Sequence, residues 1–174
     1  MKPMDILQGK WLGHPLHPAI VHVPVGTWIM ALVLDLVAHG RTVSQTVPDL
    51  ALACVILGLA GALLAVPAGI ADWAPIKKER PAWKLGLYHL VLNLLGALVW
   101  AANLGLRWKA LATAEPVTTA VLVTSIVGAA LIVVGGYLGS LMVFDQGTSV
   151  GRQSKKKWRA IAVRGGANVP EPKH

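Results

Sequence analysis

The stretch that decides the fold is residues 116–144, PVTTAVLVTSIVGAALIVVGGYLGSLMVF, with 29 positions free of Asp, Glu, Lys and Arg. A helix needs about 20 mostly apolar residues to cross the hydrocarbon core of a bilayer. Residues 50–71 and 85–106 form two further runs of 22 residues without these charges. A fourth run, 18–34, is extended to a sufficient length by the apolar residues after Asp35. The sequence therefore predicts an all-α membrane protein with four spanning helices, at about 17–38, 50–71, 85–106 and 117–144.

The composition of the whole chain agrees with a membrane location. Of its 174 residues, 55% are hydrophobic and 14% are charged, whereas soluble domains carry about 25% charged residues. The 16 basic residues outnumber the 8 acidic ones and give a net charge of +8. A chain with so much apolar surface must first place that surface in lipid. The excess of basic residues therefore does not indicate nucleic acid as a partner. The single cysteine, Cys54, argues against a disulfide framework.

Basic residues are concentrated on one side of the predicted bundle. The N-terminal segment, the connection between the second and third spans, and the C-terminal tail hold 13 Lys and Arg, and the other two connections hold 3. Cytoplasmic segments are enriched in Lys and Arg. We therefore expect an up-down-up-down bundle with both termini in the cytoplasm. His22 and Asp35 in the first span argue against a cleaved signal peptide.

Three regions are expected along the chain. Residues 1–16 form a cytoplasmic N-terminal segment, residues 17–145 the transmembrane domain, and residues 146–174 a basic and largely disordered cytoplasmic tail. The cluster at residues 155–159, KKKWR, follows the last span directly, where anionic lipid head groups attract basic side chains. Lipid head groups are thus expected partners of the tail, although these charges also serve simply to set the topology.

Two histidines lie within the predicted spans at similar depth. His22 is about one turn into the first helix and His89 a similar distance into the third, roughly 6 to 8 Å from the cytoplasmic end. The first and third helices of such a bundle are parallel and diagonal, so the two imidazoles are expected to face each other. Gly26 follows His22 by one turn, and Asn93 and Gly96 follow His89 on one face. Each histidine therefore lies beside a small or polar patch.

These residues allow three interpretations. The first is a b-type haem held between His22 and His89, with Gly26, Asn93 and Gly96 beside it, in a membrane protein that exchanges electrons with a redox partner or a quinone. The second is a metal-ion or proton site, whose alternative ligands are His14, His17, Asp72 and Asp145. The third is a non-catalytic membrane subunit in which His and Asp fix the register of the helices. No motif for nucleotide binding or hydrolysis is present, which favours a redox carrier or subunit over a hydrolase or transferase.

The two helix pairs share a pattern of ionisable residues. Each pair has a histidine near the start of its first helix and an aspartate at the end of its second, namely His22 with Asp72 and His89 with Asp145. The separations of 67 and 73 residues between the equivalent positions hint at a duplicated unit with a parallel repeat.

The segment GHPLHPAIVHVPVG at residues 13–26 resembles the signature of a family of bacterial predicted membrane proteins, domain of unknown function 2231. The resemblance continues through residues 67–73, PAGIADW, through His89 with Asn93, and through residues 135–139, GGYLG. It covers about residues 10–150. The resemblance implies a four-helix protein of the bacterial inner membrane with no defined activity. Some members of that family look as if they are joined to Rieske-type iron–sulfur domains, which points toward redox.

Overall fold

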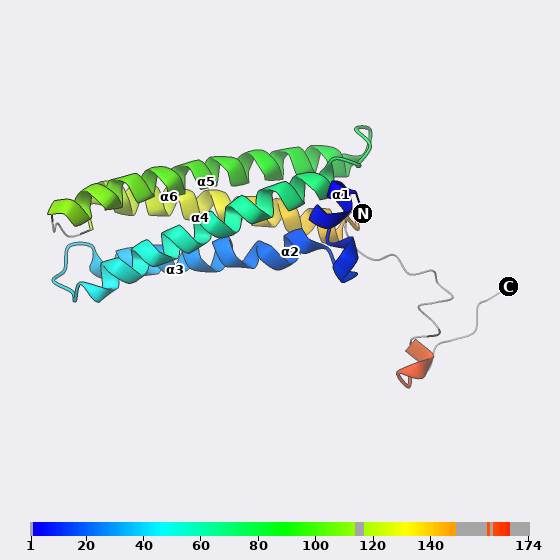
Figure 1. The fold of residues 1–174 in the computed structure, drawn as a ribbon, viewed down its shortest axis with the longest axis horizontal. Coiled ribbons are helices and arrows are strands. Elements are labelled where there is room, and N and C mark those ends of the chain that lie inside the picture. The colour runs from blue at the N-terminus through cyan, green and yellow to red at the C-terminus, as the bar shows by residue number, and fades with distance from the viewer. Residues whose placement is uncertain (1, 114–116, 149–159, 161, 168–174) are drawn as a thin grey trace.

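The structure is a computed structural model that describes residues 2–113, 117–148, 160 and 162–167. Four long helical stretches run antiparallel to their chain neighbours (Figure 1). The first stretch consists of two helices, α2 (Leu16–Ile20) and α3 (His22–Ala38). The other three are single helices, namely α4 (Thr46–Trp73), α5 (Pro81–Thr113) and α6 (Thr119–Phe144). All four stretches are long and apolar enough to cross a membrane. The prediction of four spanning helices is confirmed.

The helices continue past the charge-free runs from which they were predicted. α5 includes Lys84 near its start and Arg107 and Lys109 near its end. Lys and Arg are good helix formers, so a helix need not stop where the apolar run stops. The first stretch is interrupted at Val21, between α2 and α3. Pro24 has no N–H to offer the carbonyl of Ile20, which is why the helical hydrogen bonds break there.

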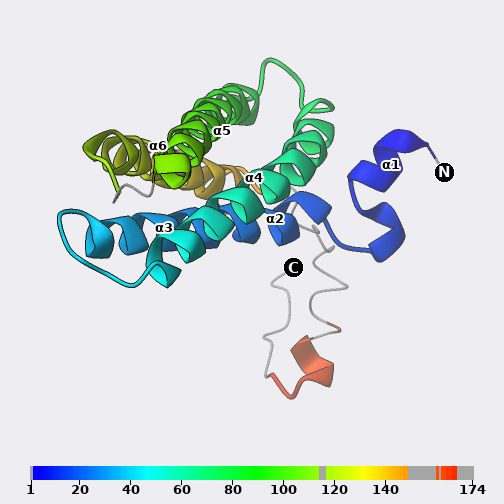
Figure 2. The same cartoon turned by 60° about the vertical axis from the view of Figure 1, so that its left-hand side comes forward.

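A short segment precedes the bundle and lies beside the end of α4 (Figure 2). It consists of α1 (Pro3–Leu7) and the single-turn helix η1 (Lys10–Leu12). Gln8 Nε2 donates to the carbonyl of Ala71 at 2.8 Å and ties the segment to α4. Lys10 Nζ donates to the Asp5 carboxylate at 2.5 Å and lowers the pKa of Asp5. Gly9 has φ of 69°, and a Cβ there would overlap the next turn of the chain, so only glycine fits.

The order of the helices around the bundle makes α3 and α5 diagonal. α3 packs against α4 and α6, and α5 packs against the same two helices. The centre is filled by the indoles of Trp28 and Trp100, which stack with ring centroids 5.5 Å apart and planes 9° from parallel. Gly58 and Gly128 make room for them, because a Cβ at Gly128 would lie 2.7 Å from Trp100 Nε1 and one at Gly58 would overlap Trp28. The diagonal placement of the first and third spans is as predicted.

The contacts of the two helix pairs repeat at constant offsets. In the first and third spans, the equivalent residues are 72 positions apart: His17 and His89, Trp28 and Trp100, Asp35 and Arg107. In the second and fourth spans they are 70 positions apart: Ala65 and Gly135, Gly58 and Gly128, Gly69 and Gly139. The bundle is therefore pseudo-symmetric about its long axis. Its repeat has a different register from the one inferred above, because His17 rather than His22 is the counterpart of His89.

The predicted tail falls mostly outside the described part of the chain. The basic cluster at 155–159 and its expected contact with lipid head groups lie outside the described residues.

Candidate functional site

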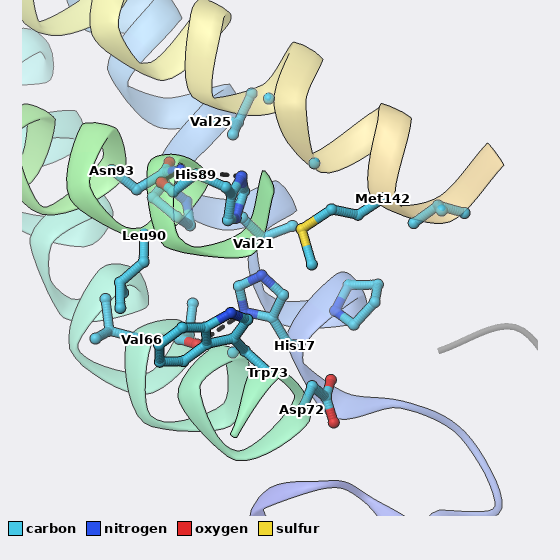
Figure 3. A pocket seen from close by; sticks show the side chains of 18 of the residues that line it. His17, Val21, Val25, Val66, Asp72, Trp73, His89, Leu90, Asn93 and Met142 are labelled. Carbon is cyan, nitrogen blue, oxygen red and sulfur yellow. Dashed lines mark hydrogen bonds between the residues drawn. The ribbon is translucent and has the colours of Figure 1, made fainter. Parts of the chain in front are cut away.

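A pocket of about 470 Å³ lies at the end of the bundle where α2 begins and α6 ends (Figure 3). It extends from Thr148, just beyond α6, to Trp28 in the centre of the bundle. Most of its walls are apolar. The histidine, carboxyl, amide and hydroxyl side chains along it are His17, His22, Asp72, His89, Asn93, Ser140 and Thr148. The volume falls in the range of pockets that hold organic ligands, about 300 to 1,000 Å³.

Two imidazoles approach one another across this pocket. The ring centroids of His17 and His89 are 6.0 Å apart, and the ring planes are 86° apart. His17 comes from α2 and His89 from the diagonal helix α5, and Figure 3 shows the two side chains pointing toward each other. This corrects the expected facing of His22 and His89. Five residues turn a helix by about 140°, so His17 and His22 cannot both face the bundle axis.

A main-chain carbonyl of a neighbouring helix fixes each of the two rings. Nδ1 of His17 lies 2.8 Å from the Ala65 carbonyl of α4, and Nδ1 of His89 lies 2.8 Å from the Gly135 carbonyl of α6. A carbonyl oxygen only accepts, so Nδ1 carries the proton in both rings. In the neutral imidazole the lone pair is then on Nε2. This tautomer and this type of partner are characteristic of histidines that ligate metals.

Glycines under the two rings make this placement possible. A Cβ at Gly69 would lie 2.9 Å from Nδ1 of His17, and a Cβ at Gly139 would lie 3.1 Å from Nδ1 of His89. Real Cβ atoms rarely come so close to a ring, so a larger residue would push the imidazole away from its carbonyl. The two glycines are 70 residues apart, and this offset is the sequence signal that pairs them.

The predicted neighbours of the histidines are only partly brought together. Asn93 lines the pocket, and its Nδ2 donates to the carbonyl of His89 at 2.7 Å. Gly96 packs against Ile132 on α6 and does not line the pocket. Gly26 is exposed, and a Cβ added to it would meet nothing within 4 Å.

The other candidate ligands are more scattered. His22 is exposed and lies at the edge of the pocket, and Asp72 lines the pocket half-buried at the end of α4. His14 and Asp145 are exposed and do not line it. Within the described ranges, no three His, Cys, Asp or Glu side chains lie close enough together to hold a metal ion. The alternative set of His14, His17, Asp72 and Asp145 is therefore not assembled.

Met142 is a pocket residue that the sequence reasoning missed. It is buried on α6, and Figure 3 shows its thioether beside the two imidazoles. It follows Asp72 by 70 residues, so it occupies in the second half the position that Asp72 occupies in the first. Only the correct register of the repeat could have identified it.

A second polar cluster is buried at the opposite end of the bundle. The Arg107 guanidinium donates to the Asp35 carboxylate, and its Nε donates to Asn103 Oδ1 at 2.7 Å. Ser125 Oγ donates to the same Asp35 oxygen at 2.6 Å. Arg107 is one of the three basic residues attributed above to the two less basic connections, whereas the structure places it inside the bundle beside Asp35. Ionisable groups within a span need such partners.

Four apolar spanning helices around a pocket that contains histidines and other polar side chains define a multi-pass helical membrane protein. More particularly, the chain belongs to the family of predicted membrane proteins described as DUF2231, whose profile matches residues 13–152. Comparisons with curated proteins and with solved structures gave no match. The family description specifies membrane location and no activity, so the function has to be argued from the site.

Proposed function

We propose that this chain is a b-type haem protein of membrane electron transfer, with His17 and His89 as the two axial ligands. The observation that carries the proposal is the pair of facing imidazoles, each with its Nδ1 hydrogen-bonded to a main-chain carbonyl at 2.8 Å. Relative to the ligand pair expected from the sequence, His17 replaces His22 and His89 is retained.

The geometry of the site fits a haem in three respects. Bonds of about 2 Å from a metal ion to one nitrogen of each ring are compatible with ring centroids 6.0 Å apart. The pocket volume of about 470 Å³ is far larger than an ion requires and suits an organic cofactor. Four-helix bundles also build such sites from side chains on facing helices.

A bound haem would supply one-electron redox chemistry, and the protein would tune it. The Ala65 and Gly135 carbonyls hold His17 and His89 in the orientation and tautomer that ligation needs. Apolar walls keep water away and so influence the potential. Among the described residues that line the pocket none is Lys or Arg, so neutral donors such as the Thr148 hydroxyl would have to meet the propionates.

The visible spectrum of detergent-purified protein from haem-sufficient cells tests this proposal. We expect a Soret band and, after dithionite reduction, the sharp bands of a bis-imidazole haem. His17→Ala and His89→Ala should each abolish that spectrum, whereas His14→Ala, at an exposed histidine outside the pocket, should leave it intact. A colourless wild-type protein would refute haem binding, and a spectrum that survives His17→Ala would refute this ligand pair.

A transition-metal ion is the second candidate for the site, and Met142 favours it. Thioether and imidazole ligands suit Cu(I), and the Met142 thioether lies beside the two imidazoles (Figure 3). If copper is the physiological ligand, metal analysis of the purified protein should find it, and Met142→Leu should weaken copper binding. The same substitution leaves both axial ligands of a haem in place, so the two candidates are separable.

We further infer that the membrane is the bacterial inner membrane and that the pocket faces the cytoplasm. The excess of Lys and Arg in the segments at the pocket end of the bundle supports this orientation. An electron partner would then be a cytoplasmic protein or a quinone in the bilayer.

A further inference from the structure

The two halves of the bundle differ beside the pocket, at positions that face lipid. There the first and fourth spans carry small or polar residues. The equivalent positions carry large apolar residues, and they lie in the third span for the first and in the second span for the fourth. The offsets of 72 and 70 residues pair His22 with Leu94, Gly26 with Leu98, Gly136 with Val66, and Ser140 with Ile70. Leu94 and Leu98 are 40% and 66% exposed, as lipid-facing side chains should be.

These differences leave polar or small residues along one side of the pocket. We call the line where α3 and α6 pack the α3/α6 seam, and its pocket-lining residues are Val21, His22, Val25, Gly136, Ser140 and Val143. Gly136 is exposed, and a Cβ added to it would meet nothing within 4 Å. On the other side, between α4 and α5, Val66 stands at the position equivalent to Gly136, and Leu90 also lines the pocket. Trp73 is fixed there by donating to the Trp83 carbonyl at 2.9 Å.

His22 is the most unusual residue of this seam. It is exposed within a membrane span, where its counterpart is a leucine, and its imidazole makes no hydrogen bond to the described part of the chain. A polar side chain at such a position is costly in lipid and indicates function. A neutral imidazole has one donor and one acceptor, so His22 can bind an oxygen that accepts or a hydroxyl that donates.

We propose that the α3/α6 seam admits the head group of a lipid-soluble quinone from the bilayer, with His22 binding one of its oxygens. A ligand that enters through the seam comes from the lipid, because the seam lies within the spanning segments. A compact head group that carries oxygen atoms suits the seam, since the seam combines the open position at Gly136 with the imidazole of His22. Ser140 Oγ donates to the Tyr137 carbonyl at 2.7 Å and keeps lone pairs that can accept from a quinol hydroxyl. Any electron transfer to this quinone rests on the proposed function, whereas its binding does not.

Titration of nanodisc-embedded protein with a short-chain benzoquinone tests the seam, with quenching of tryptophan fluorescence as the readout. Trp73 lines the pocket and reports on its occupancy. His22→Leu and Gly136→Val install the residues of the opposite half, and each should weaken binding about tenfold, the worth of a well-made hydrogen bond or a lost cavity. The matched control is Gly105→Val, an exposed glycine of α5 with open space around it, which should leave binding unchanged.

Two comparisons keep this result separate from haem binding. The titration is run on haem-free and haem-loaded protein, and the Soret band of His22→Leu is recorded, which should match that of the wild type. If quenching is saturable in the wild type and weakened in both seam variants, the result supports quinone binding at the seam, even if the protein binds no haem. Quenching that is unsaturable, or equal in the wild type and both seam variants, shows only partition of the quinone into lipid and overturns the inference, whatever the haem spectrum shows.

Discussion

The buried pair of Asp35 and Arg107 allows a sharp test of the pseudo-symmetric bundle. The Asp35 side chain has no exposed surface, and the Arg107 side chain is 5% exposed. Replacing Arg107 by Met leaves an uncompensated carboxylate in the membrane interior, and replacing Asp35 by Asn leaves an uncompensated guanidinium. Breaking a buried ion pair in this way costs about 3 to 5 kcal/mol. Both single variants should therefore unfold much more readily than the wild type.

The double exchange of Asp35→Arg with Arg107→Asp should recover part of this loss. The two positions are equivalent in the repeat, so the opposite charges should still meet across the bundle axis. Their supports are not equivalent, because the counterparts of Asn103 and Ser125 are Ala31 and Val55. Two hydrogen bonds are thus lost, each worth about 0.6 kcal/mol on average in membrane proteins and at most about 1.7. We expect the exchange to be about 1 to 3 kcal/mol less stable than the wild type.

Unfolding in mixed detergent micelles, followed by circular dichroism, measures these differences. The expected order of stability is wild type, then the double exchange, then either single variant. A double exchange that is no more stable than the single variants would show that the two positions are not interchangeable. A single variant as stable as the wild type would show that the ion pair does not contribute to stability.

Three further predictions concern the glycines and the orientation. Gly139→Ala should displace the His89 ring and reduce haem or metal occupancy severalfold, measured as cofactor per protein, while Gly105→Ala should not. Gly58→Val should overlap the Trp28 indole and lower the free energy of unfolding by about 1 to 3 kcal/mol or more, the usual cost of overpacking, measured in the same micelle assay; unchanged stability would contradict the packing of the stacked indoles. Reporter fusions should place the C-terminus in the cytoplasm and the connection between the third and fourth spans outside, and the opposite pattern would refute the orientation.

The sequence was sufficient to predict the four spans because each is a long apolar run, a property independent of how the helices pack. It also identified His89 and Asn93 as pocket residues. It could not select His17 over His22, because that choice depends on where α2 begins and on the break at Val21. Rotational register is set by tertiary packing, and no periodicity in these nearly uniform apolar spans reveals it.

Whether two equivalent residues of the two halves can differ depends on where they lie relative to the pseudo-symmetry axis. Residues that meet across the axis can remain identical when they are neutral, as His17 and His89 or the two stacked tryptophans are. A charged pair cannot, because two carboxylates or two guanidinium groups in contact inside a membrane would repel each other with little screening. Asp35 therefore requires a cation at the equivalent position, and Arg107 supplies it. Residues away from the axis face no such constraint, and this is where His22 and Leu94 differ and where the halves can acquire separate functions.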